Sequence, residues 1–109
     1  MARPFLSERL EFDEGAVEKY WFKTPSKILG RLTDLRSRLD STPWDVDSLE
    51  KVIRVYAKEQ SVSAGKVIQP LRVAVTGREA SPGIFEVLAF LGRARVLRRL
   101  DDAIARFEL

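Results

Sequence analysis

The positive charge of this sequence is concentrated in its second half. Residues 1–62 carry 11 Lys and Arg against 11 Asp and Glu, whereas residues 63–99 carry seven against two, a net charge of +5. Arginine keeps its charge and donates hydrogen bonds in a planar fork, which suits phosphates and the edges of bases. Such a segment indicates a polyanionic partner, but it is equally typical of a solvated helix face. Charge alone therefore leaves nucleic-acid binding open.

Few groups in the sequence could perform catalysis. There is no His and no Cys, which excludes a Ser-His-Asp triad, a thiolate nucleophile, disulfides and metal sites built on those ligands. The acidic pairs Asp13-Glu14 and Asp101-Asp102 are adjacent in sequence. On a helix such neighbours diverge by roughly 100°, so they do not converge on a substrate. We expect a chain without catalytic residues, without a metal and without a cofactor of its own.

The first two predicted helices have clear boundaries. Thr24-Pro25 predicts an N-cap followed by a first-turn proline, and this helix extends to about Leu39. Either Thr42 or Asp45 caps the second helix, which ends near Gln60. The residues of the two apolar stripes fall at helical spacing; they are Ile28, Leu32, Leu35 and Leu39 in the first helix and Leu49, Val52, Ile53 and Tyr56 in the second.

The segment from Lys66 to Thr76 follows a predicted loop over Ser61–Gly65 and is ambiguous. Its Val and Ile residues favour a strand, whereas a proline in its middle, Pro70, argues against a central strand. We predict a short helix capped by Ser63 and distorted near Pro70. Thr76-Gly77-Arg78 then predicts a helix end with glycine as the C-terminal cap.

Two further helices are expected at the C-terminal end. Ser81-Pro82-Gly83 predicts a helix start with Ser81 as N-cap and Pro82 in the first turn. The helix that follows is apolar nearly all round, so we expect it to be the buried centre of the domain. Gly92 ends it. The last helix has an apolar face, and its arginines, including Arg106, lie elsewhere on it. Four of them could contact backbone phosphates of a nucleic acid, but we favour a solvated face on which they pair with Asp101 and Asp102; these four are Arg93, Arg95, Arg98 and Arg99. Three aromatic residues are expected to pack at helix corners; they are Trp21, Phe22 and Trp44.

Together these elements predict an all-α fold, a compact cluster of five or six short helices. The 109 residues suffice for one modest core. No apolar run approaches the roughly 18 residues that a membrane span needs, and the N-terminus carries no signal-peptide core. We therefore expect a cytoplasmic monomer with no membrane partner.

One long motif gives the sequence a family resemblance. It reads Gly65-Lys-Val-Ile-Gln-Pro-Leu-Arg-Val-Ala-Val-Thr-Gly-Arg78, then Ser81-Pro-Gly-Ile-Phe-Glu-Val-Leu and Leu91-Gly-Arg. This pattern resembles the signature of the C-terminal anticodon-binding domain of bacterial-type glutamyl-tRNA synthetases, which are class I aminoacyl-tRNA synthetases. The match is continuous from about Gly65 to Leu100. It implies an all-α domain over residues 23–109, while residues 1–22 resemble the end of, or the link from, a preceding helical subdomain.

The resemblance also implies which residues contact RNA. The arginine of the Pro-Leu-Arg motif reads an anticodon base in the family, and here it is Arg72. The family's reading loop at the Pro-Gly helix start corresponds to Ser81, Pro82 and Ile84. RNA-binding proteins commonly read unpaired loop bases on their exposed edges, which agrees with this assignment. We further expect Lys66 and Arg78 to contact phosphates beside the reading surface.

The partner implied by the resemblance is the anticodon stem-loop of a glutamate tRNA. The parent enzyme would be a glutamate–tRNA ligase whose absent N-terminal catalytic region uses ATP and Mg²⁺, so the chain alone would be inactive. Whether such a parent also charges glutamine tRNA stays open. Two other classes remain as alternatives, a helix-turn-helix DNA-binding protein and a helical protein-docking module. The apolar helix after Gly83 argues against the first, because it would leave no face for a DNA groove.

Overall fold

The computed structural model describes residues 12–78, 80 and 82–107, and these form six α-helices with no strand. The helices are α1 (Glu14–Tyr20), α2 (Pro25–Asp40), α3 (Val46–Glu59), α4 (Ala64–Thr76), α5 (Ile84–Leu91) and α6 (Arg93–Arg106). The predicted all-α fold is therefore confirmed. Within the described residues no helix is long and apolar enough to cross a membrane.

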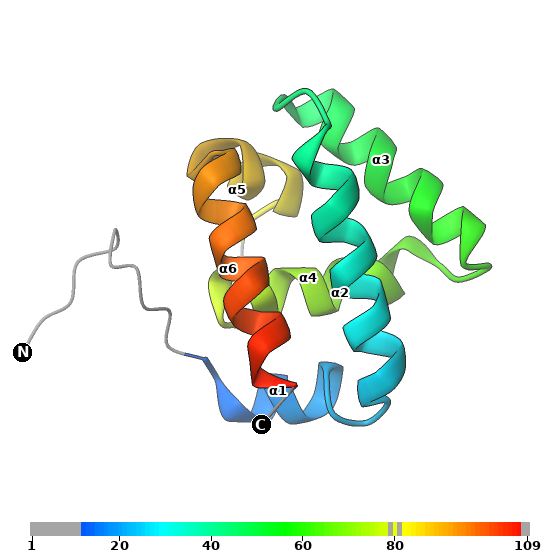
Figure 1. Cartoon of the computed structure of the whole chain (residues 1–109), viewed down its shortest axis with the longest axis vertical. Helices are drawn as coiled ribbons and strands as arrows, with labels where there is room; N and C mark the ends of the chain where they lie inside the picture. Colours follow the sequence, from blue (N-terminus) through cyan, green and yellow to red (C-terminus); the bar gives the residue numbers. More distant parts are fainter. Residues whose placement is uncertain (1–11, 79, 81, 108–109) are drawn as a thin grey trace, which may run out of the picture.

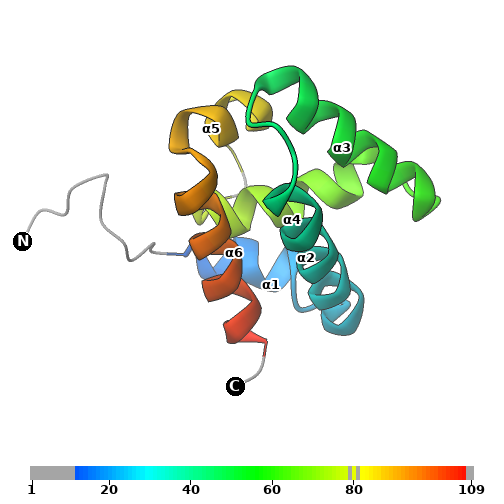
Figure 2. The same ribbon diagram turned by 45° about the horizontal axis from the view of Figure 1, so that its top comes forward.

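The helices pack as two crossed groups. In Figure 1, α2 and α6 lie side by side, α4 crosses behind them, and α1 lies across their lower ends. Figure 2 shows α3 and α5 together at the other end of the molecule, where α3 also packs on α4. Helix α4 is thus the central element, because it contacts each of the other five helices. Residues placed at its two ends consequently lie on opposite sides of the domain.

The sequence stripes form the core as predicted. Ile28, Leu32, Leu35 and Leu39 are at most 4% exposed, and the α3 stripe is buried apart from half-buried Val52. Trp21 is fully buried and its indole N–H donates to the carbonyl of Pro70 at 3.2 Å. Three rings pack around this indole; they are Phe12, Phe22 and Phe107. Trp44 is half-buried and donates to the carbonyl of Leu88, so the predicted packing role of these aromatics is confirmed.

Helix caps agree with the prediction at several positions. Thr24 and Pro25 begin α2, Asp45 caps α3 by accepting from Ser48 N at 2.8 Å, and Thr42 instead donates to Arg38 O at the end of α2. Gly77 and Gly92 end α4 and α5 with φ of 79° and 88°, where a side chain would be strained.

The predicted loop over Ser61–Gly65 is too long, because α4 already begins at Ala64 with Ser63 as N-cap. The helix prediction for Lys66–Thr76 is confirmed. Helix α4 continues through Pro70, and the distortion expected there stays a prediction. The domain boundary after residue 22 also stays a prediction.

Helix α5 differs most from the prediction. Its N-cap is Gly83, so Pro82 precedes the helix instead of lying in its first turn, while the predicted N-cap Ser81 lies outside the described residues. The expectation that α5 is the buried centre is wrong, because only Ile84 and Leu88 are buried and Phe90 is 83% exposed. An eight-residue helix at the end of the molecule needs only one buried stripe, and a uniformly apolar sequence does not show which one.

Candidate nucleic-acid interface

Arg72 lies in the second half of α4 with its side chain half-buried. Its guanidinium donates to the side-chain oxygen of Gln69, one turn earlier on the same helix. Its backbone carbonyl accepts a hydrogen bond of 2.7 Å from the hydroxyl of Thr76. The side chain is therefore at the surface and held in orientation, as a group that reads a base edge should be.

The end of α4 joins Arg72 to Arg78. The Thr76 hydroxyl, bonded to the Arg72 carbonyl, also accepts from the backbone N–H of Arg78 at 3.1 Å. Between them, Gly77 adopts the left-handed conformation that turns the chain out of the helix. Exposed Arg78, the sixth residue after Arg72, thus begins the segment toward α5 from a position that Thr76 holds.

Two other helices hold this end of α4 in place. The backbone N–H of Asp13, just before α1, donates to the carbonyl of Gly77 at 2.7 Å. From α6, Arg99 donates through Nη1 to the carbonyl of Val75 at 2.6 Å. Arg99 is only 7% exposed, so the expectation that it lies on a solvated face is wrong. Its cation satisfies a carbonyl of the last turn of α4, where positive charge is favourable.

The start of α5 presents a different surface from the one expected. Pro82 and Gly83 are exposed, but Ile84 is 3% exposed and packs in the core. Its side chain therefore offers little surface to a base. Glu86 is the third residue of the helix, and its Oε1 would lie 2.2 Å from a Cβ added to Gly83. This carboxylate thus folds back over the helix start, where it opposes the binding of a phosphate at the free N–H groups.

The remaining predicted contact, Lys66, lies apart from the others. It is exposed in the first turn of α4, and ten residues of helix separate it from Thr76, which is about 15 Å. The structure therefore brings Arg72 and Arg78 together and places Lys66 at the opposite end of α4. Phosphates contacted by Lys66 would belong to a different part of an RNA from those near Arg78.

The structure also reveals arginine–aromatic pairs that the sequence analysis missed. The guanidinium of Arg54 lies 5.8 Å from the ring centroid of Phe85, at the start of α5. Arg93 lies 5.4 Å from the ring of Trp44 and also donates to the carbonyl of Thr42. The partners of each pair lie far apart in the sequence, so no local spacing could have indicated them.

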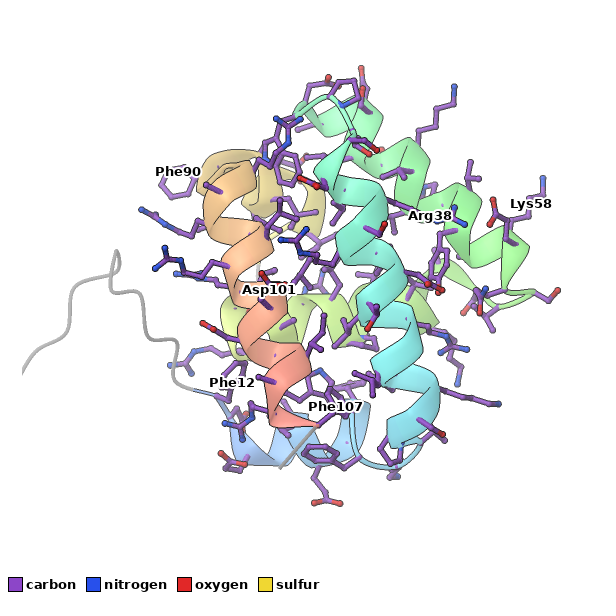
Figure 3. The ribbon with its side chains drawn as sticks, viewed as in Figure 1. Phe12, Arg38, Lys58, Phe90, Asp101 and Phe107 are labelled. Atoms are coloured by element: carbon purple, nitrogen blue, oxygen red, sulfur yellow. The ribbon has the colours of Figure 1, made fainter. Side chains whose placement is uncertain are left out.

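Asp101, which Figure 3 shows on α6, pairs with a residue of another helix. It accepts from Arg36 of α2, at 2.9 Å from Nε, and so joins the two helices. Arg106 reaches Glu14 of α1 at 3.4 Å. Among the described residues there is no group of three or more acidic side chains that could hold a metal ion.

This fold and this arrangement of cations define the class of a small all-α binding domain. The family described as an anticodon binding domain matches residues 1–104, and the chain belongs to that family. Similar proteins include "Glutamate--tRNA ligase 2" of Zymomonas mobilis, 48% identical over 95% of this chain and 25% of the relative. "Glutamate--tRNA ligase 2" of Rhizorhabdus wittichii is 44% identical over 92% of this chain and 20% of its own length.

"Glutamate--tRNA ligase" of Afipia carboxidovorans is 49% identical over 72% of this chain and 17% of its own length. The chain thus spans about a fifth to a quarter of the first two relatives and less of the third. The resemblance inferred from the motif between Gly65 and Leu100 is confirmed. The argument from α5 against a DNA-binding protein was wrong, since that helix has an exposed face, but neither the structure nor the similarities favour that alternative.

Proposed function

We propose that this chain is the anticodon-binding domain of a glutamate–tRNA ligase and that it binds the anticodon stem-loop of glutamate tRNA. Membership of the anticodon-binding family is the observation that carries the proposal. In this proposal Arg72 reads the edge of an anticodon base and Arg78 holds an adjacent phosphate. Arginine suits both tasks, because a bidentate contact discriminates bases while a phosphate contact positions the RNA.

The segment before α5 completes the proposed reading surface. Pro82 is exposed and can pack against a base, and Ser81 stays in the proposal as a hydroxyl donor. Ile84 is left out because its side chain is 3% exposed. Lys66 would contact RNA phosphates beyond this surface, at the far end of α4.

The parent protein is proposed to attach glutamate to its tRNA in the cytoplasm. ATP and Mg²⁺ would act in an N-terminal catalytic region that this chain does not include. A protein-docking module is the weaker candidate, because the described residues expose only two large hydrophobic side chains, Val55 and Phe90. Two separate side chains do not make the contiguous patch of a few hundred Å² that marks such surfaces.

Binding of the stem-loop to variants tests the two arginine roles separately. Arg72→Ala should weaken binding of the correct loop by about 5- to 150-fold and reduce discrimination at one anticodon position. Arg78→Ala should weaken all loop sequences similarly and lower the salt dependence by about one unit of slope.

Arg36→Ala is the matched control, since it removes the same charge from the contact between α2 and α6. It should affect the affinity little. The proposed base-reading role is wrong if Arg72→Ala and Arg36→Ala bind every loop sequence alike.

A further inference from the structure

The ring of Phe90 is the most exposed large hydrophobic side chain that the structure describes, at 83%. Figure 3 shows it pointing outward from α5 at the edge of the molecule. Single exposed hydrophobic residues are ordinary on protein surfaces, so exposure alone indicates no function. What distinguishes this ring is the chemistry around it and its distance from the proposed reading surface.

The stretch of sequence that contains Phe90 is rich in arginine. Residues 87–100 contain four arginines and no acidic residue. One helical turn before Phe90, Glu86 folds its carboxylate back toward Gly83 and so away from the ring. An exposed aromatic ring in an arginine-rich stretch of chain is complementary to a nucleobase carried on a phosphate backbone.

The ring is also within reach of an RNA bound at the proposed site. Phe90 lies six residues along α5 from Ile84, a rise of about 9 Å. An RNA with one nucleotide at Pro82 would therefore bring a neighbouring nucleotide near Phe90. A protein partner would need a wider apolar patch, whereas a base needs a single ring.

We infer that Phe90 is a stacking platform for one unpaired base of the RNA held by this domain. The inference rests on the proposed function, because it requires that an RNA loop occupies the start of α5. The exposed arginines of α6 would hold phosphates of the same RNA, and their charge would steer the RNA onto this end of the domain.

The test measures binding of the glutamate-tRNA anticodon stem-loop to the full chain and three Phe90 variants. Phe90→Ala should weaken binding by about 5- to 150-fold, the range expected for one base–aromatic stack. Phe90→Trp should retain the wild-type affinity because it keeps a π-face, whereas Phe90→Leu should bind as weakly as Phe90→Ala. Val55→Ala, the matched loss of another exposed hydrophobic side chain, should bind as wild type.

Single abasic sites placed along the loop identify the stacked base. One such RNA should bind wild type and Phe90→Ala equally, since it has no base to stack. All variants should unfold at the wild-type temperature, because the ring is exposed.

The inference is overturned if Phe90→Ala binds as wild type, or if Phe90→Leu restores affinity as a non-specific apolar contact would. If Phe90→Ala binds as wild type while Arg72→Ala weakens binding of the same stem-loop, only the stacking role of Phe90 fails. If the wild-type chain binds no stem-loop, the proposed function fails with it.

Discussion

Replacing Arg99 by methionine is the clearest test of how the fold supports the proposed site. The side chain is 7% exposed, and its Nη1 donates to the carbonyl of Val75 at 2.6 Å. Methionine fills much of the same volume but donates no hydrogen bond. The buried carbonyl of Val75 remains in the variant and loses its charged donor.

The expected loss of stability follows from that single contact. A hydrogen bond to a charged group contributes about 1.5–3 kcal/mol, and the carbonyl of Val75 loses this charged donor. Part of this loss is offset because the variant no longer buries the charge of Arg99. Replacing both partners of a buried ion pair by apolar residues is often neutral or stabilising. In Arg99→Met only one partner is removed, so the offset is incomplete. We therefore expect a loss of about 2 kcal/mol, which would lower the unfolding temperature by roughly 8–16 °C for a domain of this size.

Thermal unfolding followed by circular dichroism measures this effect, and Arg98→Met is the matched control. Arg98 is exposed on the same helix, so its replacement should change stability by less than about 0.5 kcal/mol. Hydrogen exchange provides a local readout at Gly77, whose N–H donates to Val73 O at 2.8 Å. Its protection should fall in Arg99→Met. Equal unfolding temperatures for Arg99→Met and Arg98→Met would refute the reasoning.

Three further changes have defined expectations. Burial and a hydrogen bond to Asp34 raise the pKa of Tyr56 to about 12, above its value near 10 in the unfolded chain. The stability that the neutral Tyr56 hydroxyl contributes is therefore complete below pH ~10 and is lost as the pH rises toward ~12. Urea unfolding of Tyr56→Phe should lack this loss, and equal pH dependence in the two proteins would contradict the account. Ser61 has a φ of 59°, so Ser61→Gly should raise stability by about 1 kcal/mol in thermal unfolding; a lower unfolding temperature would be evidence against strain there. Glu86→Gln removes the negative charge folded over Gly83 at the start of α5. Stem-loop affinity at low salt should therefore rise about two- to fivefold. Unchanged or weaker binding would show that no phosphate approaches this helix start.

Helices and helix ends could be predicted from the sequence where apolar periodicity or a glycine with positive φ determines them. The stripe that includes Leu32 and Leu35 defines α2 through periodicity, and Gly77 ends α4 because few other residues tolerate its φ of 79°. Helix α5 was predicted less well. Almost all of its positions are apolar, so its neighbours α3 and α6, rather than its own pattern, decide that Leu88 is buried and Phe90 is not.

In the candidate site, too, contacts between residues close in sequence could be predicted, whereas contacts between distant residues could not. Only five residues, which include the Thr-Gly helix end, lie between Arg72 and Arg78, so their proximity could be inferred from the chain itself. The role of Arg99 could not, because its partner Val75 is 24 residues away and only the crossing of α4 and α6 brings them together. Similarly, no spacing predicts that Arg54 lies over Phe85.

The central claim is that this chain reads part of a glutamate-tRNA anticodon, and the wild-type protein tests it most directly. Binding would be measured to the anticodon stem-loop and to loops with either of the last two anticodon bases exchanged, at several salt concentrations. The account predicts that each exchange weakens binding by about 1–3 kcal/mol at every salt concentration, while salt weakens all loops together. Binding that depends on salt but is the same for all loop sequences would contradict it, because the chain would then hold phosphates without reading bases.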